Sequence, residues 1–299
     1  MRTGFKFRGR HTSEFGLTML TKSRPILPEK RSNLIDLPGA DGSIEYAAVN
    51  DFGRAMYQNR KFTMSLHIAG SDIFDLQRKL SRAAAWLSGG AGELIFDDMP
   101  TTIWTAEVKG NIDYVPERSG TKAILEVEFD VQPFSYVDFT AAAGPSIGAE
   151  ILIGESIPMG GQSLSFDVSA AKGAEYQMNF YNCGSAPVRP VISVEVSGCP
   201  AGQFELELNG NVLAFMPFTV PIGAVVIDTD AYSAKIGNNG VSASLNGGVF
   251  ELSPGDNIVT FRPIKMLNSS LAEVTKQTYK INVDYTPKFL YAADFGGDV

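Results

Sequence analysis

The stretch Lys122-Ala-Ile-Leu-Glu-Val-Glu-Phe-Asp-Val131 shows most directly which kind of fold this chain adopts. Apolar and charged side chains alternate along it, with Leu125 and Val127 on one side and Glu126 and Glu128 on the other. A period of two residues is typical of a strand with one buried face and one solvent-facing face. The stretch therefore predicts a half-buried β-strand and a fold built on sheets.

The segments upstream repeat this pattern and add one helix. Residues 62–68 alternate in the same way, and residues 93–96 and 102–109 are further predicted strands. Residues 72–88 carry apolar side chains at helical spacing, with Asp72 as an N-cap and two glycines as a stop signal. The N-terminal part is therefore predicted to be β-rich with a single α-helix.

Two loops punctuate this part. Residues 23–38, which contain prolines and basic residues, are predicted to form an extended loop that ends in the turn Pro38-Gly39-Ala40-Asp41-Gly42. Asp97-Asp98 is predicted to lie in a turn between two strands. Adjacent acids can also serve acid/base chemistry or bind Ca²⁺, and the turn is the reading preferred here.

The C-terminal part contains short β segments and no long helical period. It follows the small-residue stretch Ala141-Ala-Ala-Gly-Pro145, which is a plausible linker. Asn209-Gly210, Asn239-Gly240 and Asn246-Gly247 are predicted hairpin turns. Ten or so strands at this spacing predict a β-sandwich or jelly roll.

The charge distribution supports two domains in the 299-residue chain. The net charge is −8, but residues 1–137 hold 17 basic and 17 acidic residues, whereas residues 138–299 hold 8 and 16. We therefore expect domains at 1–138 and 139–299. Eight basic residues fall within the first 31, which favours a packed strand that faces another subunit over a nucleic-acid-binding arm.

Several function classes lack their usual residues. The chain has two histidines and two cysteines, and it has no phosphate-binding loop, dinucleotide fingerprint, paired-cysteine metal spacing or serine nucleophile elbow. We therefore expect no enzymatic activity, no cofactor and no metal. The apolar runs are too short for a membrane span and the N-terminus resembles no secretion signal, so synthesis in a cytoplasm is expected. Cys183 and Cys199 are expected to be reduced, with a bridge between them as the alternative.

The order of these features resembles the distal tail protein (Dit) family of long-tailed, non-contractile phages and their prophages. In the N-terminal half, the matching pieces are Phe5-Lys6-Phe7, Ser13-Glu14-Phe15-Gly16-Leu17, residues 36–42, Asn59-Arg60-Lys61, the helix at 72–88, residues 94–100 and residues 129–134. In the C-terminal half they are residues 182–190 and 252–257. The resemblance covers nearly the whole chain and is weaker in the second half.

This resemblance implies a virion structural protein at the tail tip, assembled in the cytoplasm of a bacterial host. It implies a homo-hexameric ring of N-terminal belt domains, with galectin-like C-terminal sandwiches that project outward. The ring would link the tail tube to the baseplate or tail-tip hub and support receptor-binding proteins. The implied partners are the tail tube protein, the tape-measure protein and the tail-associated lysin or hub. The genome would pass through the channel without specific nucleic-acid recognition, and no membrane is involved.

Candidate contact residues follow from the basic segment at 2–31 and the loop at 36–46. The candidates for the ring interface are Arg8, Arg10, Phe15, Pro38 and Asp41, together with the edges of strands 62–68 and 122–131. Two other functions stay open. A tail-tube subunit would also form β-rich rings. A carbohydrate-binding tail or baseplate protein that contacts the host surface would use Tyr232 beside Asp230, or Tyr285 with Asp284.

Overall fold

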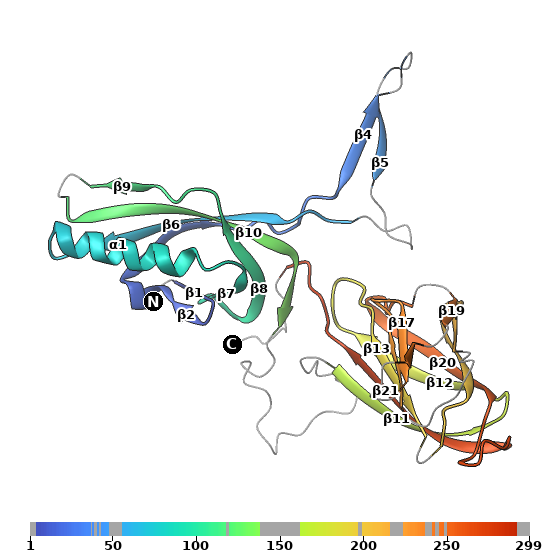
Figure 1. Cartoon of the computed structure of the whole chain (residues 1–299). Helices are drawn as coiled ribbons and strands as arrows, with labels where there is room; N and C mark the ends of the chain where they lie inside the picture. The colour runs from blue at the N-terminus through green and yellow to red at the C-terminus, as the bar shows by residue number, and fades with distance from the viewer. Residues whose placement is uncertain are drawn as a thin grey trace, which may run out of the picture. The chain divides into compact units, whose positions relative to one another are not determined.

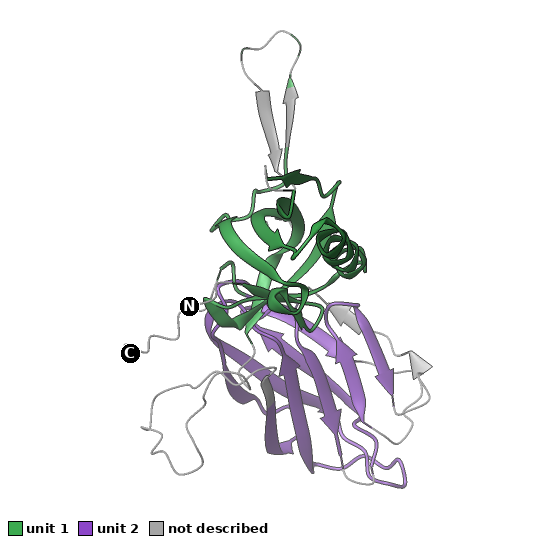
Figure 2. Cartoon of the chain, turned by 90° about the vertical axis from the view of Figure 1, so that its left-hand side faces the viewer, with its two compact units in different colours: residues 1–147, 289–299 green, residues 148–288 purple. Residues whose placement is uncertain are grey.

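The computed structural model describes most of the chain as two compact units, coloured separately in Figure 2. The described residues are 4–36, 38, 41, 43–47, 56–117, 120–137, 162–196, 199–215, 224–236, 241–242, 245–247 and 250–291. Unit 1 comprises residues 1–147 and 289–299, and unit 2 comprises residues 148–288. The predicted boundary at 138 lies outside the described residues. No helix in the described part of the chain has the length and apolar character of a membrane span.

Unit 1 is built on an eight-stranded antiparallel sheet with the order β2-β1-β7-β8-β10-β6-β3, and β9 pairs with β10 (Figure 1). The strands are β1 (Phe5–Phe7), β2 (Arg10–His11), β3 (Leu17–Ser23), β6 (Arg60–Ala69), β7 (Gly92–Phe96), β8 (Met99–Lys109), β9 (Tyr114–Pro116) and β10 (Lys122–Val137). The predicted mainly β fold is confirmed.

The alternating stretch at 122–131 lies at the centre of this sheet. Leu125, Val127 and Phe129 are buried and pair with Leu66, Met64 and Phe62 of β6. Because β6 lies between β10 and β3, and β10 lies between β8 and β6, neither strand has a free edge. The expectation that the edges of strands 62–68 and 122–131 contact another subunit is therefore wrong.

The predicted helix is confirmed as α1 (Ile73–Leu87). The Asp72 side chain accepts a hydrogen bond from the Asp75 N–H, which satisfies one of the free donors of the first turn. Leu76, Ala83, Trp86 and other buried side chains pack against the sheet in one hydrophobic core. The helix therefore covers the aromatic face of the sheet.

Residues 23–38 contain a strand that the sequence analysis did not predict. β4 (Ser32–Asp36) pairs with β5 (Ser43–Ala47) as a two-stranded hairpin, and neither strand pairs with any other strand of the described chain. The expected extended loop is thus wrong for 32–36, because the turn residues at 38–42 connect two strands. Lys30 and Tyr57, which lie before β4 and after β5 in the sequence, form a further bridge.

The end of the chain returns to unit 1, and Arg60 helps to hold it there. Ser135 and Phe289 exchange two backbone hydrogen bonds, and the Ser135 hydroxyl donates to the Tyr291 carbonyl at 2.6 Å. The Arg60 side chain is 3% exposed and donates to the carbonyls of Ile26, Pro25, Pro133 and Leu290. One buried guanidinium therefore joins three segments that are remote in sequence.

Unit 2 is a sandwich of two antiparallel sheets, as predicted. One sheet has the order β11 (Gln162–Ala171), β21 (Lys276–Tyr285), β13 (Val191–Glu195), β16 (Val225–Asp228), β17 (Ser233–Ile236), β18 (Val241–Ser242). The other has the order β12 (Tyr176–Asn182), β20 (Gly255–Lys265), β14 (Gln203–Leu208), β15 (Asn211–Phe215), β19 (Leu245–Gly247). Phe261 of the second sheet meets Tyr279 of the first, with ring centroids 4.9 Å apart in a shared core.

The predicted hairpin turns have different outcomes, and Asn239-Gly240 lies outside the described residues. Asn209-Gly210 connects β14 to β15 with positive φ at both residues, as a type I′ turn requires. Asn246-Gly247 is instead part of β19, which pairs with β15, so that prediction is wrong. Both cysteines are free and partly buried, as expected.

Two buried asparagines explain the C-terminal motifs of the resemblance. Asn182 donates to the carbonyls of Ala186 and Leu252, and its side-chain oxygen accepts from the Gly184 N–H. Asn257 closes the next turn by bonding both the N–H and the carbonyl of Ser253. These motifs therefore have a structural role, since each amide satisfies the backbone groups of its turn.

Candidate functional site

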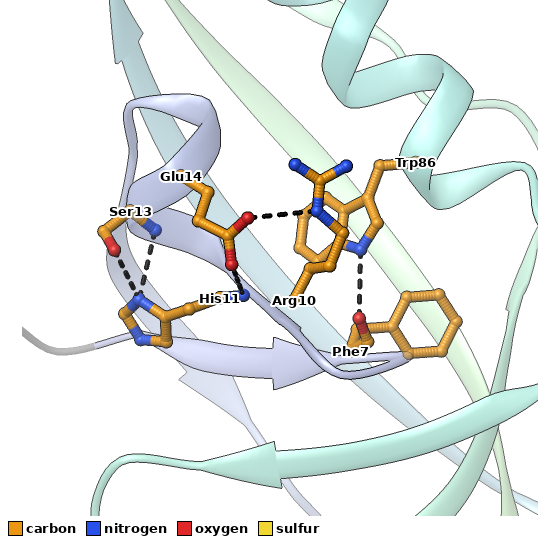
Figure 3. Close-up of polar contacts among 6 residues, drawn as sticks. All are labelled: Phe7, Arg10, His11, Ser13, Glu14 and Trp86. Atoms are coloured by element: carbon orange, nitrogen blue, oxygen red, sulfur yellow. Dashed lines mark hydrogen bonds and ion pairs between the residues drawn. The ribbon is translucent and has the colours of Figure 1, made fainter.

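The basic N-terminal segment folds onto its own unit. Arg10 donates from Nε to Glu14 at 3.0 Å, and Glu14 also accepts from the His11 N–H at 3.0 Å (Figure 3). The His11 ring accepts from the Ser13 N–H, which completes the cap of the short 3₁₀ helix η1 (Thr12–Phe15). The His11 N–H and then the Arg10 guanidinium hold the pKa of Glu14 below its ordinary value. Arg10 is therefore already paired within the protomer.

Phe15 is a core residue of unit 1. It is 4% exposed and stacks on Trp86 with ring centroids 4.4 Å apart. The Arg10 guanidinium lies over the Phe15 ring, 4.5 Å from the ring centroid. The Trp86 indole N–H donates to the Phe7 carbonyl at 3.0 Å (Figure 3). The Phe15 side chain thus connects η1 to α1.

Arg8 lies at the same, C-terminal end of α1. Its φ of 53° lies in the left-handed region, and its N–H donates to the Glu93 carbonyl at 2.9 Å. Its side chain lies against Gly89 and Gly92. The approach to Gly89 is so close that a Cβ there would come within 1.2 Å of Arg8 Nη1. Gly89 therefore does more than end the helix, since it makes room for Arg8.

The Asp97-Asp98 turn anchors the next basic residues, a role that the sequence analysis missed. Asp98 pairs with Lys22 and with Arg24, whose Nη2 lies 2.7 Å from the carboxylate. Partial burial acts to raise the pKa of Asp98, but the hydrogen bonds from Lys22 and Arg24 outweigh it and hold the pKa below its ordinary value. Asp97 lies 3.1 Å from the His11 ring. The turn therefore ties β7 and β8 to the N-terminal segment.

Pro38 and Asp41 differ from the other candidates for the ring interface. Both side chains are exposed, and both lie between β4 and β5. The structure thus separates the five candidates into three that contact their own unit and two that lie at the surface of an otherwise unpaired hairpin.

A groove of about 570 Å³ lies between the end of α1 and residues 107–113 in unit 1. Its lining includes Val108, Ile112 and the buried Leu87, together with the carboxylates of Glu107 and Asp113. The last turn of α1 contains no basic residue, but the Arg8 guanidinium lies against Gly89 at this end of the helix and Lys109 pairs with Glu107 at 2.9 Å, so two cations offset the negative groups.

The two pairs proposed for carbohydrate contact also differ. Tyr232 is 47% exposed, and Arg189 lies between it and Asp230, 5.7 Å from the ring and 3.5 Å from the carboxylate. Tyr285 is 4% exposed and donates to the Tyr181 carbonyl at 2.8 Å. Burial raises the pKa of Tyr285 to about 12. Only the Tyr232 pair can therefore meet a ligand at the surface.

Comparisons with known proteins agree with this architecture. Residues 10–131 match the family model of the phage tail protein RIFT-related domain. The chain is also similar to the crystal structure of SPP1 Dit, with a TM-score of 0.61 and 14% sequence identity. The alignment covers 96% of this chain and 99% of the SPP1 Dit chain. That protein is described as a paradigm of the hub adsorption apparatus in phages that infect Gram-positive hosts.

A second solved structure, the phage p2 baseplate in its activated conformation with Sr, aligns with 94% of this chain and 97% of that chain at 9% identity. Its TM-score is 0.36. No curated protein matches the sequence. Residues 10–131 therefore match the phage tail protein RIFT-related domain, and the chain has a fold similar to that of SPP1 Dit.

Proposed function

We propose that this protein forms a hexameric ring at the distal end of a phage tail. The ring joins the tail tube to the baseplate or tail-tip hub and supports receptor-binding proteins. The observation that carries the proposal is the combination of the phage tail domain at 10–131 with a Dit-like fold over nearly the whole chain. In this role the protein is structural rather than enzymatic, and it is part of the virion.

Its proposed partners are further copies of itself and other tail components. A cyclic ring requires two different complementary surfaces on each protomer. The β4–β5 hairpin, with Pro38 and Asp41 exposed, is a candidate for one of them, whereas the contacts of Arg8, Arg10 and Phe15 lie within the protomer. The tail tube protein, the tape-measure protein and the tail-associated lysin are the proposed neighbours along the tail axis. Assembly takes place in the cytoplasm of the bacterial host.

Light scattering on the purified full-length chain tests the ring. We expect a species of six times the 32.2 kDa protomer mass, which grows with protein concentration and appears as a ring in negative-stain images. A monomer at every concentration, or an open filament in the images, would contradict the proposal. A parallel sample that also contains the adjoining tail tube protein is the control for assembly that requires a template.

A second function, carbohydrate binding, is favoured by the Tyr232 pair. An exposed aromatic ring can stack on the C–H face of a sugar, and Asp230 and Arg189 can bind its hydroxyls. We expect the variant Tyr232→Ala to bind any saccharide that the wild type retains on a glycan array with about tenfold lower affinity. The control Tyr181→Ala removes another exposed tyrosine of unit 2. Equal retention by both variants and wild type would remove this site from consideration.

A further inference from the structure

We propose that residues 289–291 form a releasable strap that couples the end of unit 2 to the base of the β4–β5 hairpin, through Arg60 and the bulge of β10. We define the strap as residues 289–291 and the hairpin base as residues 25–31 together with 56–58. The inference concerns contacts within one protomer, so it stands or falls independently of the ring proposed above.

The strap lies beside β10 at a place that β6 leaves open. β10 pairs with β6 along residues 122–131, whereas in the described chain residues 135–137 pair with β8 and with no other strand. Ser135 and Phe289 exchange backbone hydrogen bonds of 2.9 and 3.0 Å. Because a strand bonds one neighbour on each of its two edges, the strap takes the position beside β10 that β6 fills further along.

The strap is short, and the rest of the sheet does not depend on it. Besides the two backbone bonds, the Ser135 hydroxyl donates to the Tyr291 carbonyl at 2.6 Å, and the Tyr291 ring lies 6.2 Å from the Trp104 ring. The pairing of β10 with β6 and β8 involves none of the strap residues. Such a segment can open locally while the unit stays folded.

Arg60 binds the strap and the hairpin base at the same time. Its Nη2 donates to the Leu290 carbonyl of the strap, and its Nη1 donates to the Ile26 carbonyl of the hairpin base at 2.9 Å. The side chain is 3% exposed, so these hydrogen bonds form in a poorly solvated place. Release of the strap would remove one acceptor and admit water, which weakens the bond to the hairpin base.

The bulge of β10 makes a second connection. The register of β10 with β8 shifts just before Ser135, which binds the strap. Pro133 accepts a hydrogen bond from Arg60. Between them, the Phe134 ring meets the Tyr57 ring of the hairpin base edge-on, with centroids 5.9 Å apart. Bulges re-aim side chains, and this one presents adjacent residues to the strap, to Arg60 and to the hairpin base.

The strap begins where unit 2 ends. Lys288 is the last residue of unit 2 and forms a bridge with Ala186 of the same unit, whereas Phe289 bonds Ser135 of unit 1. The Cα atoms of consecutive residues keep a fixed separation, so a displacement of Lys288 acts directly on the strap. An event in unit 2 that moves Lys288 would therefore change the order of the hairpin base.

Three amides report on this coupling. The Phe289 N–H donates to the Ser135 carbonyl and reports on the strap. The Arg31 N–H donates to a carbonyl of the hairpin base at 2.7 Å, and the Gln58 N–H donates to another at 2.8 Å. We call the first the strap amide and the other two the base amides. Hydrogen exchange read residue by residue measures how often each of these bonds opens.

Gly184→Ala in the full chain perturbs the strap from unit 2. A Cβ at Gly184 would lie 2.6 Å from the Lys288 carbonyl oxygen, so the variant displaces Lys288 and leaves the sequence of unit 1 unchanged. We expect exchange at the strap amide and at both base amides to become about tenfold faster. Unchanged exchange at the base amides would overturn the proposal.

A spacer is the matched control for this variant. Insertion of two glycines between Lys288 and Phe289 gives the chain slack, so Gly184→Ala in the spaced chain should leave exchange at the strap amide and the base amides as in the wild type. If the spaced chain shows the same acceleration, the effect does not pass along the strap and the proposal is wrong.

Tyr291→Ala perturbs the strap from unit 1. It removes the ring beside Trp104, and we expect the base amides to exchange about tenfold faster. In the Arg60→Lys background the same change should alter them less than about twofold, because one ammonium cannot bind both segments. The control Tyr114→Ala removes a 47% exposed ring on β9 and should have no effect.

The amides of residues 123–129 in β10 are the internal control, because they lie in the part of the strand that pairs with β6. They should keep their wild-type exchange in every variant. An equal acceleration there would mean that the substitution loosens all of unit 1, and a full effect of Tyr291→Ala in the Arg60→Lys background would mean that Arg60 does not carry the coupling. Either result would overturn the proposal.

Discussion

Replacement of Arg60 by leucine should destabilise unit 1 by about 4 kcal/mol. The side chain is 3% exposed, and it donates to four backbone carbonyls while its guanidinium lies 4.9 Å from the centre of the Trp104 ring. Leucine leaves those carbonyls without their donors, and buried acceptors that lose a charged partner carry a large penalty. Burial lowers the pKa of Arg60 to about 10, so the group remains charged at neutral pH.

Urea unfolding followed by tryptophan fluorescence measures this effect in unit 1 alone, because Trp86 and Trp104 are the two tryptophans of the chain. The control Lys61→Leu changes the next residue of β6, whose side chain is 74% exposed, and should leave the midpoint nearly unchanged. Arg60→Lys should recover only part of the loss, since one ammonium cannot reach carbonyls on both sides. A loss below about 1 kcal/mol for Arg60→Leu would mean that water replaces the guanidinium.

Replacement of Phe15 by alanine should cost about 3–4 kcal/mol in the isolated protomer. The ring is 4% exposed, and it fills the space between η1 and Trp86. Its removal leaves a cavity against the indole, so we also expect the Trp86 emission to shift to the red.

This prediction separates a core role from an interface role. If Phe15 contacted a neighbouring protomer, Phe15→Ala would weaken assembly and leave the unfolding of a dilute monomer unchanged. The control Leu20→Ala removes an apolar side chain that is 53% exposed on β3 and should have little effect on monomer stability.

The sequence predicts those elements whose signal is local. The alternation at 122–131 and the helix spacing at 72–88 depend on neighbours a few residues apart, and both elements form as expected. Asn209-Gly210 forms its turn for the same reason, since both residues tolerate positive φ. The sequence does not predict β4, because β4 forms through its pairing with β5 and its own composition, flanked by prolines, does not indicate a strand.

The candidate site was harder to predict because its contacts are remote in sequence. Asp98 pairs with Lys22 and Arg24 across more than 70 residues, and no spacing rule connects them. Arginine and phenylalanine are typical of interfaces, yet Arg10 pairs with Glu14 and Phe15 stacks on Trp86 inside the protomer. The return of residues 289–291 to unit 1 likewise has no counterpart in composition or charge.

That return has a consequence for how the protein is made. Ser135 and Arg60 find their partners at 289–291 only after the ribosome has synthesised all of unit 2. Unit 2 is a continuous segment, so it has every residue it needs before unit 1 does. The sandwich can therefore fold while the chain is still being made, and the N-terminal unit reaches its final form last. In the ring proposed above, this order would delay assembly until each protomer carries a finished C-terminal sandwich.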